Sequence, residues 1–82
     1  MIKSINSSAY IELIRQLISA RKNANLTGRE VDARLGEQVG FTAKTETYVR
    51  KLSVLEYFQY TAALGLSEAE GMSILLNMKN RL

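Results

Sequence analysis

The residues LTGREVDARLGEQVGFTAKTE, from Leu26 to Glu46, contain the signals that decide how this chain folds. Thr27 and Glu30 match a capping box, in which the hydroxyl accepts from a first-turn amide while the carboxylate reaches back to the capping residue. Gly36 can adopt the left-handed backbone that ends helices. Together these residues predict a short helix followed by a tight turn, and the apolar residues on its buried side are Val31 and Leu35.

Another helix is predicted to follow the turn, from about Gln38 to Thr47. Its inward side would carry Thr42 and Thr45, with Val49 as a further candidate. So thin an apolar stripe contributes little packing free energy. We therefore expect something other than apolar packing to hold or use this segment.

Helical signals continue on both sides of the quoted stretch. Ser53 with Glu56 and Ser67 with Glu70 repeat the capping-box spacing, and Ser7 or Ser8 can cap a helix near the start. We predict further helices over about 9–23, 54–64 and 68–80. The fold class is therefore all-α, a compact bundle of about five short helices with a central helix-turn-helix over about 27–47, forming a single domain over 1–82.

The composition excludes several classes of site. The 82 residues include no Cys and no His, which removes zinc fingers, thiol nucleophiles and imidazole bases. No carboxylate pair, nucleophile with a base, or phosphate-binding glycine loop occurs at a usable spacing. We predict no catalytic residues, no metal and no cofactor, and no small-molecule ligand is inferred. Without an apolar run of membrane-spanning length, the chain is expected to be soluble and cytoplasmic, with no membrane contact.

Charge is distributed unevenly along the chain. Residues 15–51 contain eight basic and four acidic residues, a net charge of +4, whereas residues 52–78 contain three acidic residues and no basic ones. This division suggests that residues 15–51 provide a surface that binds a polyanion and that residues 52–78 have a different role. A solvated surface of mixed charge is the alternative interpretation.

With its surroundings, the quoted stretch resembles the lambda-repressor and Cro-like (Xre-type) helix-turn-helix family. LIRQLISARKNANLT (13–27) is similar to the family's opening helix and following loop, and RKLSVLEYFQYTAALGLS (50–67) is similar to its fourth helix. Gly36 and Glu46 are ten positions apart, which matches the usual interval between the turn glycine and the glutamate closing the third helix. The likeness covers about Tyr10 to Leu66. It implies that the second helix of the motif enters the DNA major groove.

The sequence differs from the family pattern at several positions of the motif. Gly28 stands where a glutamine usually opens the second helix, and Asp32 stands where a small alanine usually packs between the two helices. The other departures are Thr42 and Thr45 at usually aliphatic or aromatic positions, Val39 and Gly40 at positions often held by glutamine and serine, and Tyr48 where a glycine often follows.

The resemblance implies which residues face the DNA groove, namely Gln38, Val39, Gly40, Phe41 and Lys44. Side-chain chemistry supports several of them: an amide can pair with adenine, an ammonium can reach guanine or phosphate, and apolar groups can pack on a thymine methyl. Phe41 is alternatively a core aromatic. The residues expected to hold phosphates are Arg29, Arg50 and Lys51, for which simple solubility is the alternative.

The second part of the chain is expected to serve the core and a subunit interface. Tyr57, Phe58 and Tyr60 have core spacing beside an acidic residue, which favours core packing or dimer contact over stacking on single strands. The last helix is predicted to form a homodimer interface; a membrane-facing role lacks the necessary basic face. The interface residues are expected to be Met72, Leu75, Leu76 and Met78.

These patterns predict a sequence-specific DNA-binding transcriptional regulator that binds a double-stranded operator, and not an enzyme. The family resemblance implies a repressor-like, autoregulatory protein of a phage, prophage, restriction-modification or toxin-antitoxin locus. The alternative is a helix-turn-helix fold reused for protein recognition, for example as an anti-repressor or inhibitor, because the third helix lacks the usual polar readers.

Overall fold

Local side-chain caps start α1, α2, α4 and α5, as the sequence predicts. The side chain of Ser7 accepts a hydrogen bond from the amide of Tyr10 at 3.3 Å. All three capping boxes are present with both of their hydrogen bonds. The computed structural model describes residues 7–81, which form α1 (Ser8–Asn23), α2 (Gly28–Leu35), α3 (Phe41–Glu46), α4 (Val54–Ala63), α5 (Glu68–Met78) and the 3-10 helix η1 (Lys79–Arg81).

Helix α3 is shorter than the sequence predicted. It begins at Phe41 and not at Gln38, because Gly40 has a φ of +101°, a left-handed conformation that does not continue a right-handed helix. The expected inward position of Val49 is also wrong, since this residue follows α3 in a loop and is 71% exposed. The other helices end within a few residues of their predicted limits.

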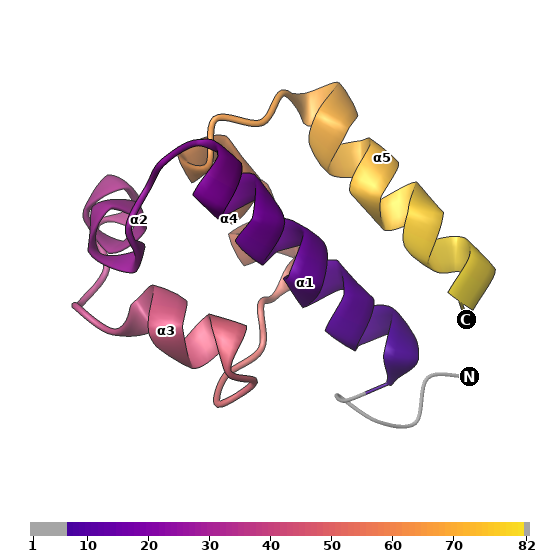
Figure 1. Cartoon of the computed structure of the whole chain (residues 1–82), viewed down its shortest axis with the longest axis horizontal. Helices are drawn as coiled ribbons and strands as arrows, with labels where there is room; N and C mark the ends of the chain where they lie inside the picture. Colours follow the sequence, from indigo (N-terminus) through magenta and orange to yellow (C-terminus); the bar gives the residue numbers. More distant parts are fainter. Residues whose placement is uncertain (1–6, 82) are drawn as a thin grey trace.

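The helices pack around one shared core, which confirms the all-α bundle. Ile14 and Leu17 of α1, Val31 of α2 and Tyr60 of α4 are fully buried in it. Figure 1 shows α5 lying beside α1 along one side of the molecule, whereas α2 and α3 lie together at the opposite end. Thr42 and Thr45 of α3 are fully buried, as expected. Because they bring little apolar surface, α3 needs polar partners to hold its position.

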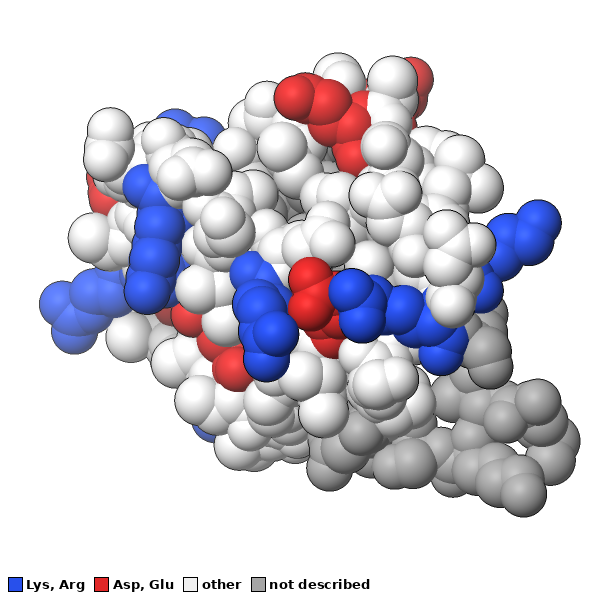
Figure 2. All heavy atoms as spheres, turned by 45° about the vertical axis from the view of Figure 1, so that its right-hand side comes forward, with Lys and Arg blue, Asp and Glu red and all other residues white. Residues whose placement is uncertain are grey.

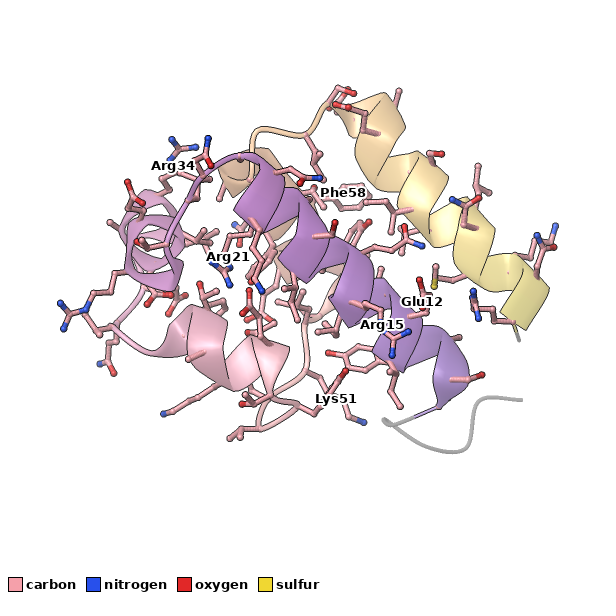
Figure 3. All side chains as sticks on the ribbon, in the orientation of Figure 1. Glu12, Arg15, Arg21, Arg34, Lys51 and Phe58 are labelled. Carbon is pink, nitrogen blue, oxygen red and sulfur yellow. The ribbon has the colours of Figure 1, made fainter. Side chains whose placement is uncertain are left out.

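An ion pair between Arg21 and Glu46 provides one such partner. The guanidinium of Arg21 donates to Glu46 through Nε at 2.7 Å and Nη2 at 3.1 Å, and its Nη1 donates to the carbonyl of Leu26 at 2.9 Å. Only 16% and 15% of the two side chains are exposed. The hydrogen bond to Glu46 raises the pKa of Arg21. Figure 3 shows Arg21 pointing from α1 toward α2 and α3, so the pair fastens the end of α3 to α1.

Between residues 7 and 81, every helix is too short or too polar to span a bilayer.

Replacing Arg21 with Ala should lower the free energy of unfolding by about 2–4 kcal/mol, because Glu46 is then left without its cation in a largely buried position. Arg15→Ala is the matched control. Arg15 also pairs with a glutamate, Glu12 at 3.4 Å, but its side chain is 72% exposed, so this change should cost less than about 0.5 kcal/mol. Chemical denaturation of the two variants measures the difference; equal costs would contradict the assigned role of Arg21.

Candidate nucleic-acid interface

The carboxylate of Asp32 caps the beginning of α3. Its Oδ2 accepts from the amide of Gly40 at 2.9 Å, and its Oδ1 accepts from both the amide and the hydroxyl of Thr42 at 2.7 Å each. Gly40, at the N-cap position, has no side chain to do this. An aspartate of the neighbouring helix α2 therefore satisfies the amides that a local cap would bind.

The burial of Asp32 is compensated by these hydrogen bonds. Only 3% of the residue is exposed, and burial alone would raise the pKa of its carboxyl group. The hydrogen bonds from Thr42 and Gly40 outweigh that effect, so the pKa is lowered. The carboxylate therefore remains ionised inside the protein and stabilises α3 as an anion at a helix N-terminus.

Three departures from the family pattern meet at this point. Thr42 supplies the hydroxyl that an aliphatic residue would lack, and Asp32 supplies the acceptor that an alanine would lack. Gly28, the first residue of α2, lies directly against Thr42: a Cβ built on Gly28 would be 3.6 Å from the Thr42 side chain. The substitutions thus form one local arrangement in which a hydrogen-bonded pair replaces apolar contact between α2 and α3.

A surface hollow lies beside α3 and the turn before it. It is lined by five of the eight residues predicted from sequence to contact DNA. Of these, Gln38, Val39 and Lys44 are exposed, whereas Phe41 and Arg50 are half-buried. The sequence interpretation did not include the two other lining residues, Glu37 and Val49. The full lining is Glu37, Gln38, Val39, Phe41, Lys44, Val49 and Arg50.

The turn before α3, and not the helix itself, carries part of this surface. Because α3 starts at Phe41, Gln38 and Val39 lie in the turn, and the side chain of Val39 is 71% exposed. Gly40, another predicted groove residue, is half-buried and does not line the hollow. An exposed valine beside an exposed amide and an ammonium gives the hollow both apolar and hydrogen-bonding groups.

Arg50 is held in place by two neighbours. Its guanidinium carbon lies 4.3 Å from the centre of the Phe41 ring, and its Nη2 donates to Glu56 at 2.9 Å. Glu56 also belongs to the capping box of α4, and its pKa is lowered by hydrogen bonds from Ser53 and Arg50. Phe41 packs against the core as well. The stack therefore links the start of α3 to the start of α4 and fixes the direction of Arg50.

The remaining predicted contacts lie outside the hollow. Arg29, near the beginning of α2, is exposed, as is Lys51 in the loop between α3 and α4. Figure 3 shows Lys51 below α3, away from α2. Neither cation lines the hollow, and the two belong to different parts of the chain.

Tyr48 occupies the position after α3 where the family often has a glycine. Its φ is +65°, in the left-handed region, and its ring lies 6.3 Å from that of Tyr10. The aromatic contact with α1 compensates for an unfavourable backbone conformation.

The comparisons with known proteins agree with this geometry. No family model matches the chain, and no curated protein matches it in sequence. The solved structure of an XRE-family like protein from Pseudomonas syringae pv. tomato str. DC3000 has a similar fold, with a TM-score of 0.81 and 30% sequence identity. The match covers 93% of this chain and 91% of that chain.

Replacing Asp32 with Ala should lower the free energy of unfolding by about 2–4 kcal/mol at neutral pH, because buried donors of Gly40 and Thr42 are then left without an acceptor. Asp32→Asn should also destabilise the fold, because the amide N–H group of asparagine would face the N–H and O–H donors of Gly40 and Thr42. Glu37→Gln, at an exposed carboxylate five positions further along the chain, is the control and should change the free energy of unfolding by less than about 0.5 kcal/mol.

The contribution of Asp32 to the free energy of unfolding should decrease at low pH. Since folding lowers its pKa, its stabilising contribution is present above the unfolded value of about 3.9 and is lost as pH falls through the folded value. The stability difference between the natural protein and Asp32→Asn should therefore shrink below about pH 4. Urea denaturation across pH measures it, and a constant difference would count against an ionised cap.

Proposed function

The chain belongs to the Xre-type helix-turn-helix family, and from this premise we propose that it binds double-stranded DNA as a sequence-specific transcriptional regulator. The observation that carries the proposal is the hollow beside α3, in which Gln38, Val39 and Lys44 are exposed together. Base edges in the major groove offer hydrogen-bonding groups and thymine methyls, which such a set of side chains complements.

Each exposed group has a distinct task in this proposal. Gln38 forms paired hydrogen bonds with an adenine, and Val39 packs on a thymine methyl. Lys44 reaches a guanine or a phosphate. Phe41 supports the surface from beneath, and the backbone of Gly40 lets the turn approach the bases closely.

Phosphate contacts hold the protein in register on the duplex. Arg29 in α2 and Lys51 after α3 are exposed and do not line the hollow. In this proposal they contact the DNA backbone on either side of the bases. Arg50 is the third cation, directed by Phe41 and Glu56. These groups contribute affinity but little sequence preference.

We further propose that the regulator acts as a homodimer on a two-fold symmetric operator. Of the residues expected at the interface, Met72 and Leu76 are 44% and 60% exposed. Leu75 is half-buried, and Met78 is buried within the subunit and offers little surface to a partner, which counts against its expected place at the interface. Small helix-turn-helix domains gain both affinity and operator symmetry from dimerisation.

The biological role that fits best is that of a cytoplasmic repressor of its own operon. Neither Cys nor His occurs in the chain, and among the described residues no acidic cluster is able to hold a metal. The proposed role rests on the exposed side chains of the hollow beside α3.

Binding to the DNA upstream of the protein's own gene should weaken steeply with salt. Two subunits carrying Arg29, Lys44, Arg50 and Lys51 would neutralise about six to eight phosphates, so affinity should fall on the order of a thousandfold between about 50 and 200 mM salt. Gel shifts at several salt concentrations test this. A flat response would favour protein recognition by the same surface instead.

Base reading and phosphate holding should be separable by substitution. Gln38→Ala should weaken the free energy of binding to the operator by about 1–3 kcal/mol, because it removes directional hydrogen bonds to a base. Its binding to random DNA should change little. Lys51→Ala should weaken binding to both DNAs alike and reduce the salt slope by about one for each phosphate that is no longer neutralised.

The operator itself can be selected from random DNA before these affinities are compared. Val49→Thr, a similar-sized change in the hollow, reports whether that side chain also meets the bases. If Gln38→Ala weakens operator and random DNA equally, the turn before α3 does not read sequence.

A further inference from the structure

The outer side of α5 is self-complementary, and we propose that a second copy of this chain packs against it in antiparallel orientation, with Glu68 facing the partner's Lys79. The inference rests on the proposed homodimer and adds its geometry. In Figure 1, α5 is the outermost helix on its side of the molecule, lying beside α1.

One side of α5 serves the subunit core. Gly71 and Met78 are buried, and Ile74 and Leu75 are half-buried against the core. The hydroxyl of Tyr57 donates to the carbonyl of Gly71 at 2.7 Å and ties α4 to this side. Within residues 7–81, the other residues of α5 are exposed and so available to another partner.

A stripe of four exposed residues runs along that free surface. Glu68, Met72, Leu76 and Lys79 are separated by four, four and three positions, the spacing that places residues on one side of a helix. Met72 and Leu76 are large apolar side chains with 44% and 60% of their surface exposed. The stripe thus begins with an anion, continues with two apolar groups and ends with a cation.

This order matches itself under a two-fold rotation. The midpoint between Glu68 and Lys79 falls between Ser73 and Ile74, and the midpoint between Met72 and Leu76 falls at Ile74. A single two-fold axis crossing α5 there would bring both pairs together at once. Met72 would pack on the partner's Leu76 while Glu68 meets the partner's Lys79, twice in each dimer.

Charge selects the antiparallel arrangement over the parallel one. Parallel helices would place Glu68 beside the partner's Glu68 and Lys79 beside the partner's Lys79, where like charges repel. Figure 2 shows acidic side chains gathered at the top of this face, where α5 begins, above a broad uncharged area.

Apolar surface continues from the stripe toward α4. Met72 is three positions from Leu75, which lines an apolar groove together with Leu13 of α1 and with Val54 and Phe58 of α4. Figure 3 shows Phe58 pointing into the region between α4 and α5. The groove borders the stripe, so the partner helix would cover more apolar area than Met72 and Leu76 alone provide.

Charge reversal tests the register. Glu68→Lys alone should weaken dimerisation about tenfold, because two exposed attractive pairs become repulsive, and Lys79→Glu alone should do the same. The double variant Glu68→Lys/Lys79→Glu should regain the affinity of the natural protein. Sedimentation velocity over a concentration series gives the dissociation constants.

Mixing the two single variants is the sharper experiment. In an equimolar mixture, Glu68→Lys and Lys79→Glu chains can pair through two attractive contacts, so a heterodimer should form with nearly natural affinity. Residues 68 and 79 are too far apart on one helix to interact within a chain, and therefore only contact between chains explains such recovery.

Asn77→Lys is the matched control. Residue 77 is exposed on the same helix but nine positions from Glu68, half a turn around the helix from the stripe, so the added charge should leave dimerisation unchanged. Thermal melts of each variant check that α5 remains folded. At about 1 M salt the charge effects should largely vanish, since screening then acts within about 3 Å.

Two results would overturn the inference in different ways. If the single variants weaken the dimer but neither the double variant nor the mixture recovers, the dimer exists with another register. If the natural protein is monomeric at tens of micromolar, the proposed homodimer fails as well. DNA binding is measured separately on random DNA, so either result leaves the assignment of the hollow beside α3 open to its own test.

Discussion

A single buried carboxylate holds the helix-turn-helix together. Helix α3 has six residues, follows an N-cap glycine that has no side chain to cap it, and turns two threonines toward the core. Asp32 of α2 accepts hydrogen bonds from Gly40 and Thr42, and so supplies from a neighbouring helix what the local sequence lacks. Without this acceptor the first amides of α3 would be buried without partners.

The other end of α3 is held by the same kind of interaction. Glu46 closes the helix and is bound by the fork of Arg21, which also donates to the carbonyl of Leu26. Polar contacts therefore fix both ends of a helix that buries little apolar surface. Such directional bonds define the position of α3, and of the turn before it that carries Gln38 and Val39, more narrowly than apolar contact would.

The two parts of the chain differ in what they leave uncovered. Around α3, the hollow combines an amide, a lysine and two exposed valines, and Arg50 is directed by Phe41 and Glu56. Along α5, the free surface is apolar in its middle and oppositely charged at its ends.

The sequence by itself determined the helices, because their signals are local. Each capping box joins residues three apart, so all three could be predicted, as could the core spacing of α1 and the burial of Thr42 and Thr45. It also pointed to five residues that do line one hollow. The start of α3, the exposure of Val49 and the burial of Met78 depended on the fold. So did the pairs Asp32–Thr42 and Arg21–Glu46, ten and 25 positions apart. Only tertiary structure decided these, because a carboxylate finds a partner on another helix only after packing has brought the two together and excluded water.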